Sequence, residues 1–137
     1  MAGGFNKLVV VGKRKTSVAK ATITDGSGEI TINLRPISAY PELKQLEISE
    51  PLIIAKEILG KLDFDISVNV HGGGMSSRIE ASRLAIARAI VKFLKNDKLK
   101  EAFIAYDRNM IIADTRRKEA RKPGDSKARA MRQTSYR

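Results

Sequence analysis

Three consecutive glycines, Gly72–Gly74, followed closely by Ser76 and Ser77, are the part of the sequence that most suggests chemistry. Backbone amides of a glycine-rich loop that opens a helix can bind phosphate. The segment lacks the lysine and spacing of a Walker loop, and it lacks the spacing of a dinucleotide-binding loop. Two interpretations stay open: the glycines permit a tight strand-to-helix connection, or their amides also bind a phosphate of an RNA backbone.

A small-molecule kinase fragment that binds ATP at residues 72–77 is an alternative from another class. The glycine loops of sugar-alcohol and mevalonate kinases look somewhat like this one. Such a kinase needs a further domain and a catalytic acid, and residues 1–115 leave little room for either.

The acidic residues and the one histidine do not assemble a reaction centre. Asp63 and Asp65 share a face of a predicted strand as a candidate metal or acid pair, but no third ligand is near in sequence, which favours surface carboxylates. His71 has no sequence-adjacent nucleophile, and there is no cysteine. We therefore expect a protein that is not an enzyme and that uses no metal, no cofactor and no small-molecule substrate.

Positive charge is the stronger signal. The chain has 26 Lys and Arg against 15 Asp and Glu, a net charge of +11, and residues 116–137 hold nine of these cations and two acids. That stretch contains no Leu, Ile, Val or Phe, so it cannot form a core of its own. Its 22 residues would reach on the order of 70 Å when extended. We expect a globular RNA-docking domain, residues 1–115, and a basic arm, residues 116–137.

Nucleic acid is the partner that this charge pattern favours over a simple solubility tail. The arm prefers arginine, whose planar guanidinium binds phosphate with two hydrogen bonds and stacks on bases. Three consecutive cations, Lys13–Lys15, stand beside the hydroxyls of Thr16 and Ser17 and suit further phosphate contacts. A free-standing regulatory RNA or DNA binder is a third hypothesis.

Hydrophobic periodicity predicts the strands that carry these residues. Residues 17–24 and 29–34 alternate apolar and polar side chains, with turn residues between them, and predict a hairpin with Leu34 facing inward. Residues 63–71 predict a strand with one apolar and one polar face. A strand-like piece over 110–113 precedes the arm.

Capping signals predict the helices. Ser49 with Pro51 predicts a helix that starts there and ends at Gly60. Ser77 with Glu80 predicts the capped start of a long helix. That helix carries a cationic stripe of Arg88, Lys92 and Lys95, and a shorter helix over 99–106 follows it. Together these elements predict an α+β fold with one layer of sheet and one of helices.

Membrane association is not expected. The longest apolar runs have four residues, whereas a span needs about 20. The N-terminal residues carry no pattern typical of a secretory signal. We expect the protein to remain in the cytoplasm.

Four motifs that together span nearly the whole chain carry a resemblance to a known family. They are the basic segment 12–19, the segment 26–36 with its Arg-Pro pair, the glycines 72–74 with the helix 84–90, and the ending 114–137. They resemble universal small-subunit ribosomal protein number nine in its archaeal and eukaryotic form. The final Ser-Tyr-Arg is similar to that form, whereas bacterial members tend to end in Ser-Lys-Arg.

The resemblance implies a fold like the second domain of ribosomal protein five. It implies a place in the head of the small subunit, on RNA of the 3′ major domain, beside neighbouring head proteins. It also implies that the arm reaches the anticodon stem-loop of peptidyl-site tRNA. The residues expected to bind ribosomal RNA are Lys13, Arg14, Lys15, Gly72, Gly73, Gly74, Arg78, Arg116, Arg117, Lys118, Arg121, Lys122, Lys127, Arg129 and Arg132. Those expected to contact tRNA are Tyr136 and Arg137.

Overall fold

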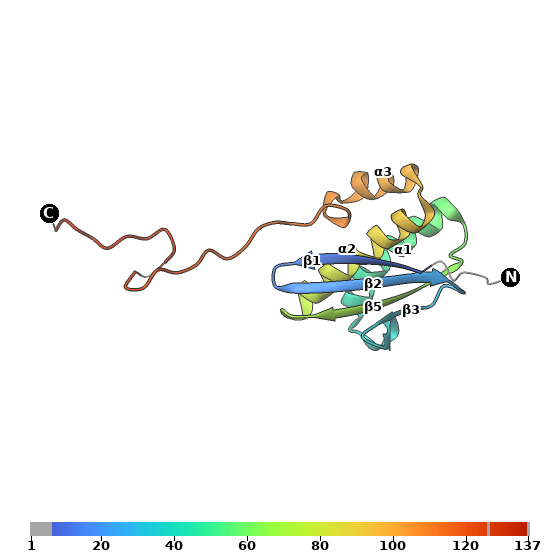
Figure 1. Cartoon of the computed structure of the whole chain (residues 1–137), viewed down its shortest axis with the longest axis horizontal. Coiled ribbons are helices and arrows are strands. Elements are labelled where there is room, and N and C mark those ends of the chain that lie inside the picture. Colours follow the sequence, from blue (N-terminus) through green and yellow to red (C-terminus); the bar gives the residue numbers. More distant parts are fainter. Residues whose placement is uncertain (1–6, 126, 137) are drawn as a thin grey trace.

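The computed structural model of the chain describes residues 7–125 and 127–136. A five-stranded sheet forms one layer and helices form the other (Figure 1). The strands are β1 (Leu8–Arg14), β2 (Ser17–Asp25), β3 (Ile30–Ile32), β4 (Arg35–Pro36) and β5 (Phe64–His71). The helices are α1 (Glu42–Leu59), α2 (Met75–Leu94) and α3 (Asp97–Tyr106), with short 3-10 turns at Ile37–Ala39 and Arg108–Met110. The mixed α and β architecture is the expected one.

The sheet order corrects the predicted hairpin. The strands lie in the order β1-β2-β5-β3-β4, so β5 separates the two segments that were expected to pair. β2 is antiparallel to β1 and β5, whereas β3 is parallel to β5 and antiparallel to β4. The turn residues after β2, residues 26–29, form an arch over the start of β5. Oδ1 of Asp65 holds this arch by accepting hydrogen bonds from the amides of Ser27, Gly28 and Glu29 at 2.8, 2.9 and 2.9 Å.

Two further expectations at chain turns are wrong. Leu34 does not face inward but is 92% exposed. It forms the turn between β3 and β4 with Asn33, and both residues have positive φ, as a two-residue hairpin turn of this kind requires. Residues 110–113 form no strand: a 3-10 turn ends at Met110, which is buried, and irregular chain follows.

The helices begin earlier than their capping signals suggested. α1 starts after Pro41, seven residues before Ser49, and carries Pro51 in its interior. Its expected end is confirmed, because Gly60 has a φ of 77° and its amide donates to the carbonyl of Lys56. α2 starts at Met75, which places Ser77 in the first turn.

The core lies between the sheet and α2, as the strand alternation predicted. Alternate residues of β2 and β5 are buried there, namely Ala19, Ala21 and Ile23 with Phe64, Ile66, Val68 and Val70. β1 approaches α2 with almost no space between the backbones. A Cβ on Gly12 would overlap the carbonyl oxygen of Ala81 and lie 2.7 Å from the amide nitrogen of Ala85. Small residues on both elements therefore set the distance between the layers.

No helix in the described parts of the chain has the length and apolar character needed to cross a bilayer.

Candidate nucleic-acid interface

The turn between β1 and β2 lies directly beside the glycine loop, although 55 residues separate them in sequence. A Cβ on Gly72 would lie 2.5 Å from the carbonyl oxygen of Thr16. Oγ of Ser17 and Nε of Arg78 both donate to the carbonyl of Gly72, each at 2.9 Å. The contacts bring Arg78 to the end of the molecule that carries Lys13 and Lys15, and all three cations are exposed.

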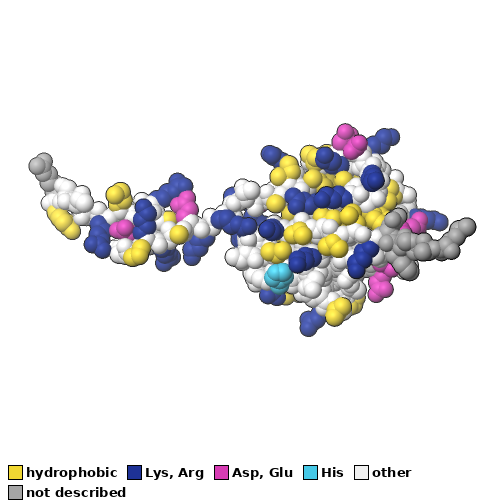
Figure 2. Space-filling view, in the orientation of Figure 1, with side chains coloured by type: hydrophobic (Ala, Val, Ile, Leu, Met, Phe, Trp, Pro, Cys, Tyr) yellow, Lys and Arg dark blue, Asp and Glu magenta, His cyan; other side chains and the backbone are white. Residues whose placement is uncertain are grey.

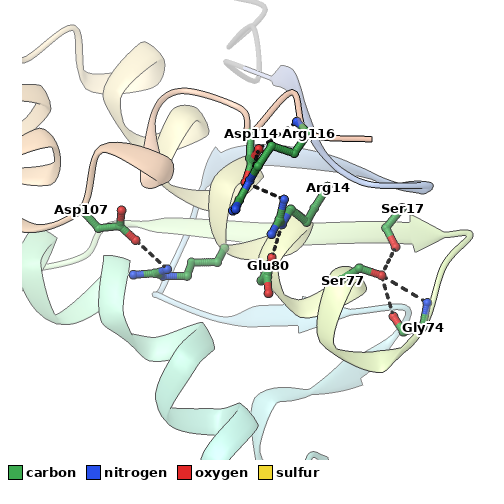
Figure 3. A network of polar contacts seen from close by, with 9 residues as sticks. Arg14, Ser17, Gly74, Ser77, Glu80, Asp107, Asp114 and Arg116 are labelled. Carbon is green, nitrogen blue, oxygen red and sulfur yellow. Dashed lines mark hydrogen bonds and ion pairs between the residues drawn. The ribbon is translucent and has the colours of Figure 1, made fainter. Parts of the chain in front are cut away.

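The glycine loop is held by serine hydroxyls (Figure 3). The Oγ atoms of Ser17 and Ser77 lie 2.8 Å apart, and a Cβ on Gly73 would overlap both. Oγ of Ser77 also accepts the amide of Gly74 at 3.2 Å. These contacts favour the interpretation that the glycines permit a tight connection. A bulky residue at Gly73 would disturb the loop with or without a ligand.

Arg14 is engaged by carboxylates on two other elements. Its Nε pairs with Glu80 on α2, and its Nη1 lies 2.7 Å from Oδ2 of Asp114 (Figure 3). Asp114 also accepts from the amide of Arg116 at 2.9 Å and from its guanidinium at 2.6 Å. The hydrogen bonds from Arg116 hold the pKa of Asp114 well below its usual range, and Arg14 adds to the effect. Asp114 in turn raises the pKa of Arg116.

A cavity of about 390 Å³ lies beside this network, and its lining carries charges of both signs. Arg83 pairs there with Asp107 at 3.1 Å and with Glu50. Lys44 pairs with Glu47 at 2.7 Å. Because Arg83 and Lys44 are already paired with carboxylates, much of the positive charge of the lining is unavailable to an anion.

The sheet face turned away from the helices is open and carries cations. Lys20 stands at its centre, paired in register with Val11 on one side and Asn69 on the other. His71 and Lys13 flank Val18 in the next row. Figure 2 shows this face, with Lys and Arg side chains spread across it, the one histidine among them, and carboxylates toward its margins. Lys20 was missing from the expected site, although strand alternation had already placed it on the polar face.

The cationic stripe predicted on the long helix does not join this interface. Arg88 is half-buried, and it donates to the carbonyls of Ile111 at 2.7 Å and of Val11 at 3.1 Å. It therefore fastens β1 and the chain after α3 to α2. Lys92 and Lys95 are exposed, but they lie beside Asp25, at the opposite end of β2 from the glycine loop.

The two aspartates considered as a metal pair have separate roles. The amides of the arch, that of Glu29 foremost, lower the pKa of Asp65. Asp63, which immediately precedes β5, is exposed. Within residues 7–125 and 127–136, no three His, Cys, Asp or Glu side chains are grouped so that they could bind a metal ion.

The basic C-terminal segment leaves the body from the same end as the glycine loop (Figure 1). From residue 113 to 136, the described chain forms neither helix nor strand. Arg129 pairs with Glu119 at 3.0 Å, which raises the pKa of Arg129, and Arg132 donates to the carbonyl of Gly124 at 3.0 Å. The other expected RNA-binding cations, Arg117, Lys118, Arg121, Lys122 and Lys127, are exposed. Tyr136 is 86% exposed, and Arg137 lies outside the described residues.

A small α+β domain with cations on an open sheet face, and with more cations where a basic segment departs, has the layout of a protein that binds nucleic acid. The model of the family described as ribosomal protein S9/S16 matches residues 12–137, and the chain belongs to that family. It is 46% identical over 130 residues to the small ribosomal subunit protein uS9 of Methanococcus vannielii, an alignment that covers 93% of this chain and 96% of the relative. It is 46% identical over 131 residues to the protein of the same name from Thermoplasma acidophilum, covering 95% and 100%. The expected family and its archaeal type are confirmed.

Proposed function

We propose that this protein is a non-catalytic structural constituent of the small ribosomal subunit that binds ribosomal RNA. The observation that carries the proposal is the collection of exposed cations at one end of the body. Lys13, Lys15 and Arg78 come from three elements, and Asp114 holds Arg116 beside them. A basic end at the root of a basic segment gives one continuous surface for phosphates.

The open sheet face extends this surface. Lys20 and Lys13 supply charge, and Asn69 and His71 supply hydrogen-bonding groups. Phosphate contacts by such residues position an RNA without reading its sequence. Their affinity comes largely from released counterions, so it falls steeply as salt rises.

The segment from residue 116 onward would act as an anchor that orders on RNA. Its exposed cations neutralise phosphates, and contacts with RNA fix a chain whose described residues form neither helix nor strand. The family resemblance supports a place in the head of the subunit, on the 3′ major domain and beside other head proteins. It also supports a fold like the second domain of ribosomal protein five, which a superposition of the two would test.

Tyr136 and Arg137 are the residues that we propose to approach peptidyl-site tRNA. The exposure of Tyr136 and its distance from the body along the chain support this role (Figure 1). Tyr136 offers a ring for stacking and a hydroxyl for hydrogen bonding.

Salt-dependent rebinding to small subunits tests the proposal. Small subunits from cells depleted of this protein are mixed with the full-length chain and sedimented on sucrose gradients at increasing salt. The matched variant replaces Arg117, Lys118, Arg121, Lys122 and Lys127 with Gln and keeps Arg116, because Arg116 is bonded to Asp114. We expect the variant to dissociate at lower salt, with a log-log salt slope reduced by about 0.7 to 0.9 for each phosphate that is no longer neutralised.

Failure of the wild-type chain to rebind would contradict the ribosomal proposal and favour a free-standing RNA or DNA binder. Rebinding with equal salt dependence for both chains would leave the ribosomal assignment in place and would remove the anchoring role of the segment.

A further inference from the structure

The outer face of α1 differs in charge from the rest of the molecule. With 3.6 residues per turn, six side chains fall within an arc of about 100° on this helix. Three are apolar, namely Leu43, Leu46 and Ile53, and three are acidic, namely Glu42, Glu57 and Glu50, of which Glu50 is half-buried and pairs with Arg83 on α2. Along the 18 residues of α1, all of which are described, no Lys or Arg falls within that arc. We call the five residues other than Glu50 the outer face of α1.

The apolar side chains of this face are exposed. Leu43 is 74% exposed, Leu46 57% and Ile53 52%, whereas the opposite side of the helix buries Ile48 and Ala55 completely. Isolated exposed leucines are ordinary on a protein surface, but three in a row on one helix face mark an interaction site. α1 therefore presents an apolar stripe that the described part of the chain leaves largely exposed.

The charges of this face exclude RNA as its natural partner. Glu42 and Glu57 are exposed, and carboxylates repel a phosphate backbone. The side chains of leucine and isoleucine form neither ion pairs nor hydrogen bonds with phosphates. The chain as a whole has a charge of +11, so a face with two exposed acids and no cation stands out as the part that suits a cationic partner.

We infer that the outer face of α1 docks a basic polypeptide segment of another small-subunit protein, one in which aliphatic side chains alternate with Lys or Arg. The aliphatic groups cover Leu43, Leu46 and Ile53, and the cations pair with Glu42 and Glu57. This inference rests on the proposed function, and it adds a protein contact on the side of the body that α1 forms. The protein thus joins RNA, at its open sheet face and basic end, to a protein neighbour at α1.

Lysine substitutions on the outer face of α1 should weaken binding to a cationic protein partner but should not weaken binding to RNA. Leu46→Lys combined with Ile53→Lys adds two cations, and the aliphatic stems of lysine preserve much of the packing on the helix. The control pair, Leu94→Lys with Ile104→Lys, makes the same charge change at exposed apolar positions on α2 and α3. Thermal melts establish that both variants are folded.

Both full-length variants are tested on depleted small subunits and on protein-free small-subunit RNA. We expect the α1 variant to rebind the subunits about tenfold more weakly than the control pair, because its lysines repel a cationic partner. It should bind protein-free RNA no more weakly than the control. Stronger binding of the α1 variant in both assays would show that this face meets RNA and would overturn the inference.

Photo-crosslinking identifies what covers the face. A photoreactive phenylalanine analogue at Leu46 is compared with the same analogue at Val9, which is 53% exposed on the open sheet face. We expect Leu46 to crosslink, in the assembled subunit, to a peptide that contains Lys or Arg among aliphatic residues, and Val9 to crosslink to RNA.

Any of three results would overturn the inference: Leu46 crosslinks to RNA, it crosslinks to a second copy of this chain, or it does not crosslink while Val9 does. Failure of the unmodified chain to rebind subunits would instead count against the proposed function, so the two failures are distinguishable.

Discussion

Asp114 and Arg14 form an ion pair of 2.7 Å that binds the start of the basic segment to the tip of β1. Arg14 ends the first strand, and Asp114 is separated from it by 100 residues of chain. Because Asp114 also holds Arg116, the segment leaves the body from a fixed point beside Lys13 and Lys15. The first phosphate contacts that we propose for the segment can therefore be continuous with those that we propose for the body.

Replacing Asp114 with Ala should loosen the root of the segment without unfolding the domain. The amide of Arg116 loses its acceptor, so its hydrogen exchange in the free protein should become several-fold faster. NMR-detected exchange measures this amide directly. Asp125→Ala is the control, because Asp125 is an acid further along the segment that lies 3.7 Å from Arg132 of the same segment. Unchanged exchange at Arg116 would contradict the role of Asp114.

Gly12→Ala should destabilise the domain by about 1–3 kcal/mol, the usual cost of overpacking. The new Cβ would overlap the backbone of Ala81 and Ala85, which cannot move without displacing α2 from the sheet. Urea denaturation measures the loss. Gly74→Ala is the matched control, because a Cβ there has no atom within 4 Å and φ is −95°. Equal stability of the two variants would mean that the layers can separate at little cost.

Asp65→Ala should lower thermal stability at neutral pH, and the loss should shrink as pH falls. Asp65 accepts three amides of the arch, which lower its pKa in the folded state. A lowered folded pKa contributes stability above the unfolded pKa, about 4, and this contribution is lost as pH falls through the folded value. Melting temperatures from pH 7 to pH 2 should therefore converge for wild type and variant. The control is Asp63→Ala, two residues away: because the Asp63 side chain is exposed, its removal should change the melting temperature little at neutral pH.

Deleting Arg137 should speed dissociation of peptidyl-site tRNA about fivefold, which corresponds to about 1 kcal/mol for one exposed charge-assisted contact. At the preceding position, Tyr136→Phe keeps a stacking surface and removes the hydroxyl, whereas Tyr136→Ala removes both. A dissociation rate that changes only with Ala assigns stacking to Tyr136. Dissociation rates are measured on reconstituted subunits. If all three variants release tRNA at the wild-type rate, the end of the segment does not contact the tRNA.

Local patterns predicted the faces of the elements well, because side-chain alternation depends on neighbours in sequence. Ala19, Ala21 and Ile23 are buried as expected, and Lys20 is exposed. The predicted pairing of β2 with β3 was wrong, because strand pairing is decided by contacts between residues that are far apart in sequence. Turn residues at 25–28 are typical of a hairpin. In this structure, however, hydrogen bonding to Asp65 holds them in an arch over β5.

Proline explains the error at the first helix. Ser49 before Glu50 and Pro51 is typical of a helix start, yet here the proline sits in the middle of an 18-residue helix. Charge alone pointed to Lys13 and Lys15 and to the cations of the arm, which are exposed at every described position, but it did not show that Arg14 pairs with Glu80 and Asp114. The contacts of Arg88 were not predictable, because no local pattern shows that its guanidinium reaches the carbonyls of Val11 and Ile111.

The central position of β5 has a consequence for the order in which the molecule can fold during synthesis. The β1–β2 hairpin and the β3–β4 hairpin each consist of near neighbours, so each can form soon after it emerges. Neither can join the other until residues 64–71 arrive between them. We expect the nascent chain to pass through a stage with two separate hairpins and to form one sheet when β5 inserts.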